Sequence, residues 1–442
     1  MTTLPKEVQY NKPMASLPSD TKSTNVIVRP SNNTVFGAGG DIIQFDLPAH
    51  AFLVPSSLTL RGRIKSVAAV DATANYMWGA PAASWIQRVE TIVGGTLIES
   101  INDYGRLYNM ISQTKIDYAT KAGLQLELAY GGGGSTGNDP VNPTFHTLNG
   151  RQLPTGTTSA ATQEFGFALP LGCLLSSCSE LIPLGLMGGV RIQITTDMLQ
   201  NFVQCHTPAS PPTFDIKDLE LNFDLVDFGA GMEGVVASMA NANGDLLLKS
   251  QGWNVSNVNF PQQVAGNSTD FIYNVRLSSI KSLVLQGSGT ASANAVGGLY
   301  EAVKYAGESG STQFFVANTP LPPTPIRESN QASVMSSLRQ AFGEGTDIYS
   351  SNIAIPTKQY IRALGGAATT FNEPDSHFVG VNCEKLSTNS VMMSGLSSQL
   401  TPISVRVEAG DATNADATLT LFACYDAILS IQPATRQVAT RV

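Results

Sequence analysis

Residues 84–112 are the stretch that most constrains the fold of this chain. Their sequence, SWIQRVETIVGGTLIESINDYGRLYNMIS, places Val89 and Val93 among polar residues in an alternation typical of a half-buried strand. The pair Gly94-Gly95 tolerates positive φ at both positions, so it predicts the turn of a β-hairpin. We therefore expect two antiparallel strands on either side of these glycines.

A helix is predicted directly after this hairpin. Asn102 or Asp103 offers an N-cap, and four apolar residues follow at helical spacing on one face: Tyr104, Leu107, Tyr108 and Ile111. A tight hairpin that leads straight into one short helix, inside a β-rich chain, is a distinctive unit. Residues 314–343 repeat part of this plan.

Alternating apolar and polar residues predict strands through the rest of the chain. The clearest covers residues 218–225, where Leu219, Leu221, Phe223 and Leu225 share one face. Further strands are predicted at residues 25–29, 41–48, 57–65, 164–171, 190–195, 271–286, 313–316, 378–382, 403–408 and 418–431. We expect a break near Ser278 in the long segment 271–286.

In the second half, a proline-rich segment precedes a predicted helix. The sequence NTPLPPTPI reads as an extended crossing, because proline disfavours helices and central strands. Ser329 can cap the following helix, whose apolar face would hold Val334, Leu338, Ala341 and Phe342.

The pattern of many short strands predicts an all-β fold made of two similar units. We expect an extended N-terminal arm at residues 1–23, a first unit at 24–228, a linker at 229–249, a second unit at 250–435 and a C-terminal tail at 436–442. Each unit would be an antiparallel sandwich or barrel with one helix and long loops, including residues 113–162 and 287–311. The tandem arrangement suggests duplication, although no residue-level repeat proves it.

Composition excludes several functions. Only 14% of the 442 residues are charged, and the net charge is −8 without any run of Lys or Arg. Direct binding of nucleic acid needs cations that neutralise phosphates, so we do not expect it. Low charge suits a protein that buries large surfaces against copies of itself. No apolar run approaches a membrane span, and no signal peptide is evident, so synthesis in the cytoplasm is expected.

No motif for catalysis, cofactor binding or metal binding is convincing. Gly229, Gly231 and Gly234 match GxGxxG, but no βαβ unit surrounds them, so we interpret them as linker glycines. The four histidines are unpaired, and we expect no GxSxG nucleophile elbow of the α/β-hydrolase kind. The five cysteines lack CxxC spacing and are expected to be buried free thiols. We predict no enzyme activity, no cofactor and no metal.

The order of segments resembles the double jelly-roll major capsid proteins of tailless icosahedral DNA viruses, the tectivirus–adenovirus lineage. The segments that carry this resemblance in the first half are DIIQFDLP, SSLTLRGRI, the hairpin and helix of residues 84–112, EFGFALPL and DLELNFDLVDF. In the second half they are NTPLPPTPI and TLTLFACYDAILSI. The resemblance covers roughly residues 25–435 and is one of pattern and order.

This resemblance implies two tandem eight-stranded antiparallel jelly-roll barrels in each chain. Three copies would form a pseudo-hexameric homotrimer, and many trimers would assemble with neighbouring capsomers into an icosahedral shell. The virion would be the location, with minor capsid or vertex proteins and an internal lipid membrane as further partners. The modest length fits a small bacteriophage member.

Two other functions remain open at this point. A lectin-like or receptor-binding β-sandwich protein of a virion or cell surface would expose clustered aromatic residues on loops. Aromatic residues are few in the long first loop, where Tyr130 and Phe145 lie, which gives this function little support. A bicupin-type or glycoside-active enzyme would need a metal site or a carboxylate pair that the sequence does not single out.

Overall fold

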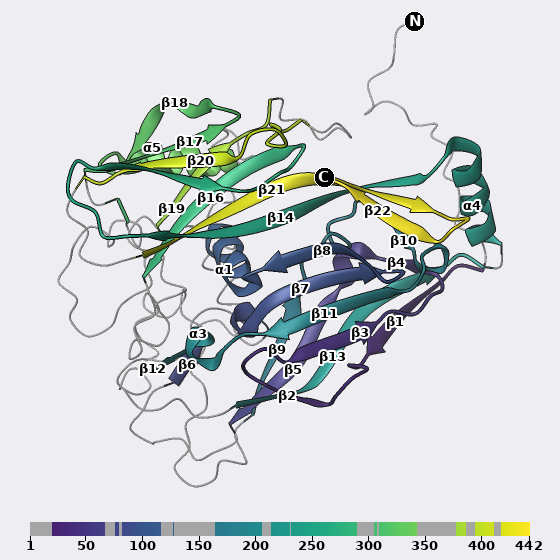
Figure 1. Ribbon diagram of the computed structural model, residues 1–442. Helices are drawn as coiled ribbons and strands as arrows, with labels where there is room; N and C mark the ends of the chain where they lie inside the picture. The colour runs from purple at the N-terminus through teal and green to yellow at the C-terminus, as the bar shows by residue number, and fades with distance from the viewer. Residues whose placement is uncertain are drawn as a thin grey trace, which may run out of the picture.

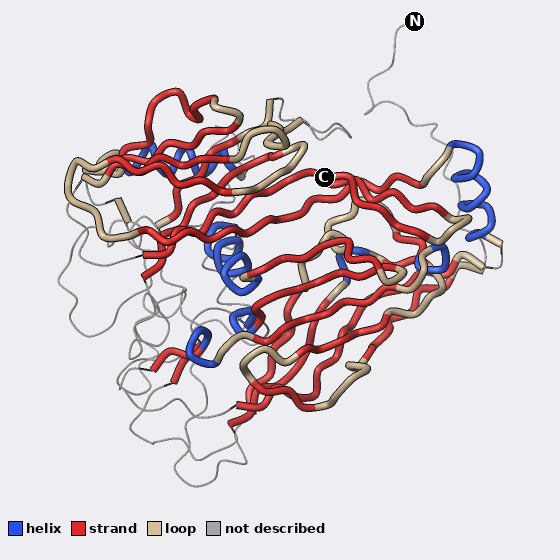
Figure 2. Tube along the Cα trace, in the orientation of Figure 1, coloured by secondary structure: helices blue, strands red, loops and turns tan. Residues whose placement is uncertain are grey.

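Antiparallel β-sheets dominate the structure, with a few short helices at their ends (Figure 2). This computed structural model describes residues 20–66, 76–78, 82–115, 127, 164–205, 214–229, 231–289, 305–306, 309–342, 377–385, 394–410 and 417–442. Most of the predicted N-terminal arm and of the predicted loops 113–162 and 287–311 lies outside these residues.

The first half of the chain forms two main sheets. The larger contains β1 (Lys22–Val28), β2 (Val35–Gly37), β4 (Phe52–Leu53), β5 (Thr59–Ser66), β9 (Glu164–Pro170), β10 (Ile182–Pro183) and β13 (Phe214–Asp227). The smaller contains β3 (Ile42–Asp46), β7 (Ile86–Val93), β8 (Thr96–Asn102) and β11 (Val190–Thr196). A separate short pair joins β6 (Tyr76–Trp78) to β12 (Val203–Cys205).

The second half repeats this plan. One sheet contains β14 (Leu246–Phe260), β16 (Ile280–Gly289), β19 (Phe378–Asn382), β21 (Ala417–Gln432) and β22 (Gln437–Arg441). The other contains β15 (Ser268–Tyr273), β17 (Ser311–Val316), β18 (Thr319–Arg327) and β20 (Ile403–Glu408). Figure 1 shows the two halves lying side by side.

Strand order identifies each half as a jelly roll. In the first half, one sheet runs β1-β13-β5-β9 through its centre, and the facing sheet runs β3-β11-β7-β8. In the second half, the corresponding orders are β14-β21-β16-β19 and β15-β20-β17-β18. The two halves thus use eight strands each in the same order, which confirms the predicted fold of two tandem eight-stranded antiparallel barrels.

Inward-facing side chains from these strands form the core. The predicted apolar face of β13 is buried, with Leu221 and Phe223 at 0% exposure. The alternating face of β21 is buried as well, with Leu419 and Ile431 at 0% exposure and Tyr425 at 7%. Burying apolar area at this scale supplies most of the stability of a β-sandwich.

The helices within the described residues are few. They are α1 (Tyr104–Lys115), α3 (Leu199–Phe202), α4 (Met232–Asn243) and α5 (Gln331–Ala341), with 3₁₀ turns η2 (Pro55–Ser57), η3 (Ala82–Trp85) and η4 (Leu184–Leu186). Within the described ranges, none of the helices is both long and apolar enough to cross a bilayer. α1 and α5 occupy equivalent places, each directly after a hairpin of the smaller sheet.

The second hairpin differs from the sequence-based expectation. The segment predicted as a proline-rich crossing is strand β18, which pairs with β17 through a turn at Ala317 and Asn318, where φ is 51° and 63°. β18 is an edge strand, where a missing backbone N–H can be tolerated. The predicted cap Ser329 is also wrong: the Asn330 side chain accepts the hydrogen bond from Ser333 N. The predicted apolar face of α5 is otherwise buried at Val334 and Leu338.

Two segments predicted as linker and tail are regular structure. The predicted linker, residues 229–249, contains α4, and β14 already begins at Leu246. The predicted tail, residues 436–442, contains β22, which pairs with β21. β1 likewise begins at Lys22, inside the predicted arm. The small residues of α4 hid its helical character, because Gly and Asn are poor helix formers.

The hairpin between β7 and β8 makes a testable prediction. Gly94 and Gly95 form its turn with φ of 57° and 82°, a conformation that costs an L-residue about 1–2 kcal/mol per position. We expect the double replacement Gly94→Val and Gly95→Val to destabilise the first jelly roll strongly, measured by urea unfolding. The control is Gly234→Ala in α4, which has open space around it and should gain about 0.5–1 kcal/mol. A double-valine protein of wild-type stability would contradict the role of these glycines.

Candidate functional site

Helix α1 lies at the junction between the two jelly rolls (Figure 1). It starts after Asp103, whose backbone carbonyl accepts hydrogen bonds from the N–H groups of Arg106 and Leu107 at 3.0 and 3.1 Å. Burial is not limited to one apolar face, because Leu107, Asn109 and Arg106 are only 3%, 1% and 8% exposed. A helix covered on all sides must have protein packed against each side.

The second jelly roll supplies that packing. Arg106 Nη1 donates a hydrogen bond to Thr420 Oγ1 in β21 at 3.0 Å, inside the protein. At the start of the helix, Asn257 Nδ2 in β14 donates to Asp103 Oδ2 at 2.5 Å. At its end, the Lys115 ammonium lies 5.4 Å from the centre of the Phe342 ring, just after α5. The helix therefore contacts the second barrel at its start, in its first turn and at its end.

A second set of contacts at the junction is centred on the backbone of Leu174. Its N–H donates to Glu99 Oε2 in β8 at 2.6 Å, and its carbonyl accepts from Ser250 Oγ in β14 at 2.6 Å. The neighbouring Ser177 Oγ lies 2.7 Å from Ser250 Oγ and donates to the carbonyl of Gln251 at 2.6 Å. These bonds connect the first jelly roll to the second through the buried Ser250 hydroxyl and the exposed Ser177 hydroxyl.

The electrostatics of this junction depend on Glu99. The residue is 5% exposed, and burial raises the pKa of its carboxyl to about 8, although the Leu174 N–H opposes the shift. The ionisable groups that face it are Tyr104, Cys173, Cys178 and Tyr425. Burial raises the pKa of the Cys173 thiol to about 12 and also raises that of Tyr104. Burial therefore disfavours the charged form of Glu99 and of the groups around it.

The C-terminal strand adds a third connection. Thr440 Oγ1 in β22 donates to the carbonyl of Ile98 in β8 at 3.4 Å. Close backbone packing lies beside it: a Cβ atom on Gly188 would come within 3.0 Å of the Arg436 carbonyl oxygen and 3.1 Å of Gly94 Cα. The chain end thus packs against the tip of the first hairpin.

The structure separates the glycines singled out from the sequence. Gly94 and Gly95 form the β7–β8 turn and lie next to the C-terminal strand. Gly229 and Gly231 have φ of 92° and 102° and lead into α4, whereas Gly234 is part of that helix. α4 connects two antiparallel sheets, so the GxGxxG match does not occur in a βαβ unit.

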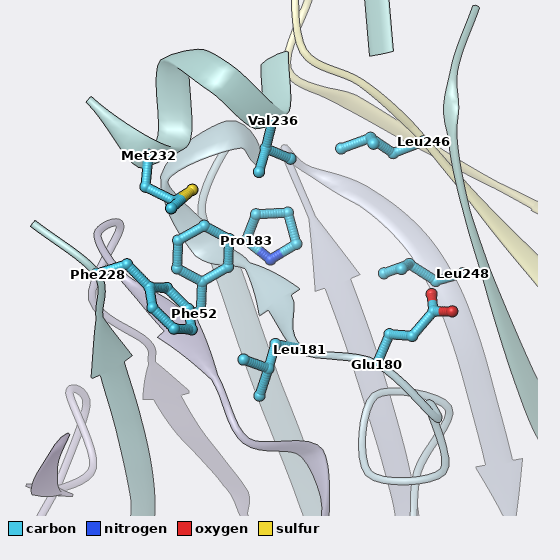
Figure 3. Close-up of a pocket in the computed structure, with 9 residues that line it drawn as sticks. All are labelled: Phe52, Glu180, Leu181, Pro183, Phe228, Met232, Val236, Leu246 and Leu248. Atoms are coloured by element: carbon cyan, nitrogen blue, oxygen red, sulfur yellow. The ribbon is translucent and has the colours of Figure 1, made fainter. Parts of the chain in front are cut away.

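A pocket of about 310 Å³ lies beneath α4, next to the start of β14 (Figure 3). Its lining is apolar apart from one carboxylate and comprises Phe52, Glu180, Leu181, Pro183, Phe228, Met232, Val236, Leu246 and Leu248. Such a lining suits apolar contacts rather than acid–base chemistry.

The cysteines agree with the sequence-based expectation where they are described. Cys173, Cys178, Cys383 and Cys424 are buried free thiols. Among the described residues, no group of three or more His, Cys, Asp or Glu side chains is arranged to hold a metal ion.

Sequence reasoning missed the junction residues Glu99, Leu174 and Ser250. One signal was available: Glu99 falls between Leu97 and Ile101 on the same side of a predicted strand, and Ile101 is buried. A carboxylate in line with a core residue indicates either a buried site or an irregular strand. The partners of Glu99 come from distant segments and carried no pattern of their own.

Comparisons with known proteins confirm the fold. No protein-family model and no curated protein matches the sequence. Among solved structures, the Faustovirus major capsid protein matches with a TM-score of 0.62 at 11% identity, covering 97% of this chain and 93% of that chain. PBCV-1 VP54 matches with a TM-score of 0.57 at 11% identity, covering 98% and 99%. The mavirus major capsid protein matches with a TM-score of 0.52 at 11% identity, covering 100% and 95%.

These similarities define the class of fold. The structural neighbours are double jelly-roll capsid proteins, and the match extends over nearly the full length of both chains. The chain has the double jelly-roll fold, as its order of segments predicted. At 11% identity the similarity establishes the fold alone. The roles of the junction residues follow from their own contacts.

The raised pKa of Glu99 predicts how stability depends on pH. In the unfolded chain the carboxyl titrates near 4.5, whereas in the folded protein it titrates near 8. Its contribution to stability is therefore complete below pH 4.5 and is lost as pH rises through 8. Between these values, wild-type protein should lose up to about 1.4 kcal/mol of unfolding free energy per pH unit relative to Glu99→Gln. Urea titrations at several pH values measure this difference; parallel pH profiles would contradict it.

Ser250→Ala tests the hydrogen bonds at Leu174. The substitution leaves the buried Leu174 carbonyl without its Ser250 donor and should cost about 1–3 kcal/mol of unfolding free energy. Ser238→Ala is the matched control, because the Ser238 hydroxyl bonds only to the exposed α4 helix at Val235. Equal effects of the two substitutions on chemical denaturation would show that the junction bond adds no stability.

Proposed function

We propose that this protein is the major capsid protein of an icosahedral virus. One observation carries the proposal: a single chain contains two jelly rolls with the same strand order, fixed side by side through a buried junction. Solved major capsid proteins of Faustovirus and mavirus share this architecture over more than nine-tenths of their own length. Its role is structural and non-enzymatic.

Symmetry explains how such a chain builds a shell. Each copy contributes two similar lobes, so three copies around a threefold axis present six lobes in a pseudo-hexagonal outline. Pseudo-hexagonal units tile a surface with few kinds of lateral contact. The low charged content of 14% favours these contacts, because fewer charges must be desolvated when the flanks of neighbouring units meet.

Several finer features belong to the same proposal. We take residues 22–228 and 246–435 as the two jelly rolls, with α4 between them and β22 as an addition to the second. The protein would be made in the host cytoplasm and reside in the capsid shell of the virion. Minor capsid or vertex proteins, and an internal membrane, would be its other partners, and a bacteriophage remains the predicted source. Sequence-specific contact with nucleic acid is not part of its role.

The oligomeric state tests this function. Purified full-length protein should sediment as a trimer of about 140 kDa, three copies of the 46.7 kDa chain, over a range of concentrations. Negative-stain images of the same sample should show six lobes. A folded protein that stays monomeric at all concentrations would overturn the proposal and would favour a β-sandwich binding protein.

A further inference from the structure

Three ionisable side chains converge in the second jelly roll on the pair of strands β16 and β21. Lys281 Nζ lies 3.1 Å from Glu384 Oε1 and 4.0 Å from Asp426 Oδ1. The side chains of Asp426 and Glu384 are only 1% and 8% exposed, and that of Lys281 is 23% exposed. An amine and two carboxylates therefore share one largely buried site.

The Asp426 carboxyl group is held in one orientation. Ser279 Oγ donates to Asp426 Oδ2 at 3.0 Å and itself accepts from Gly395 N at 3.0 Å. The Asp426 N–H donates to the Ser279 carbonyl at 3.1 Å, which fixes the backbone as well. The other oxygen, Oδ1, is buried and accepts no hydrogen bond. Lys281 Nζ lies 4.0 Å from it.

Glu384 is also fixed close to the amine. The N–H of Cys383 donates to the Lys281 carbonyl at 2.8 Å, which ties the segment after β19 to β16. The Glu384 N–H donates to Asn382 Oδ1 at 2.8 Å, and Ser394 Oγ donates to Glu384 Oε1 at 3.4 Å. These bonds hold the Glu384 carboxylate within hydrogen-bonding distance of Lys281 Nζ, at 3.1 Å.

An exposed ion pair in the other sheet of the second jelly roll, between β15 and β20, serves as a comparison. Arg406 Nε and Nη2 bond to both oxygens of Asp270 at 2.7 and 2.9 Å, and both side chains are half exposed. The Lys281 site differs in depth, in its unpaired carboxyl oxygen and in its use of lysine, whose amine can act as a nucleophile. Burying charges without full hydrogen bonding is unfavourable, and condensation would remove two of them.

We propose that Lys281 and Asp426 form an intramolecular amide cross-link, with Glu384 as the proton carrier. Glu384 Oε1 takes one proton from the Lys281 ammonium, and the freed lone pair on Nζ attacks Cγ of Asp426. Glu384 passes that proton to Oδ1, which also receives a second proton from Nζ. The Cγ–Oδ1 bond then breaks and water leaves, so an ammonium and a carboxylate become an amide and water, with nothing oxidised or reduced.

The hydrogen bond from Ser279 assists this step. Oδ2 becomes the amide oxygen, and the Ser279 hydroxyl stabilises the negative charge that develops on it in the tetrahedral intermediate. The product joins adjacent strands of one sheet and closes the chain between residues 281 and 426. A covalent cross-link of this kind restricts the conformations of the unfolded chain, as a disulfide does. Its formation needs no oxidising environment.

Intact mass spectrometry of the purified full-length protein tests the cross-link directly. Wild-type protein should be lighter than its sequence mass by one water, about 18 Da, and a peptide digest should contain one branched product joining residues 281 and 426. Lys281→Arg retains the positive charge but lacks the primary amine, so it should have its full sequence mass. Glu384→Gln should form the product far more slowly.

The main measurement uses the wild-type protein, so its result does not depend on whether a variant folds. Folded wild-type protein that keeps its full sequence mass after prolonged incubation would overturn the proposal and leave an ion pair. A branched peptide joining Lys281 to Glu384 would also overturn it, because the assigned acceptor would be wrong. Circular dichroism confirms that each sample is folded before its mass is interpreted.

Discussion

A helix buried between two β-sandwiches requires that each of its polar side chains have a partner, because an unpaired polar group away from water is costly. α1 meets this requirement in two ways. The hydroxyl groups of Ser112 and Thr114 donate hydrogen bonds to the backbone carbonyls of Asn109 and Met110. Arg106 bonds to Thr420 of the second jelly roll. The position of one barrel on the other is therefore tied to the helix that the first hairpin produces.

The duplicated plan makes this arrangement easier to understand. α1 and α5 follow equivalent hairpins, yet they lie in different surroundings. α5 packs on its own barrel, against β19, β16 and β18, and keeps exposed residues on its outer side. α1 has a second barrel on that outer side, and polar contacts with β14 and β21 replace water there. The repeated strand order thus gives two similar lobes, and the contacts of α1 connect them.

Local pattern predicted the parts of the fold that depend on one buried face. The alternation in β13 and β21, the turn glycines and the apolar stripe of α5 are such cases. Three elements escaped prediction for physical reasons. Prolines in β18 are tolerated because it is an edge strand, α4 is rich in small residues, and β22 buries one apolar residue, Val438, so it shows no apolar alternation. Junction and cross-link residues escaped because their partners are distant in sequence.

Hydrogen exchange in α1 tests the central claim that this helix is enclosed by both barrels. α1 and α4 have the same length, 12 residues, but α4 is partly exposed at the end of the molecule. Mass spectrometry of exchanged peptides should place the α1 amides in the slowest class, together with β13 and β21, while α4 exchanges far sooner. If α1 exchanges as fast as α4 while β13 and β21 stay protected, the junction does not hold the two jelly rolls together.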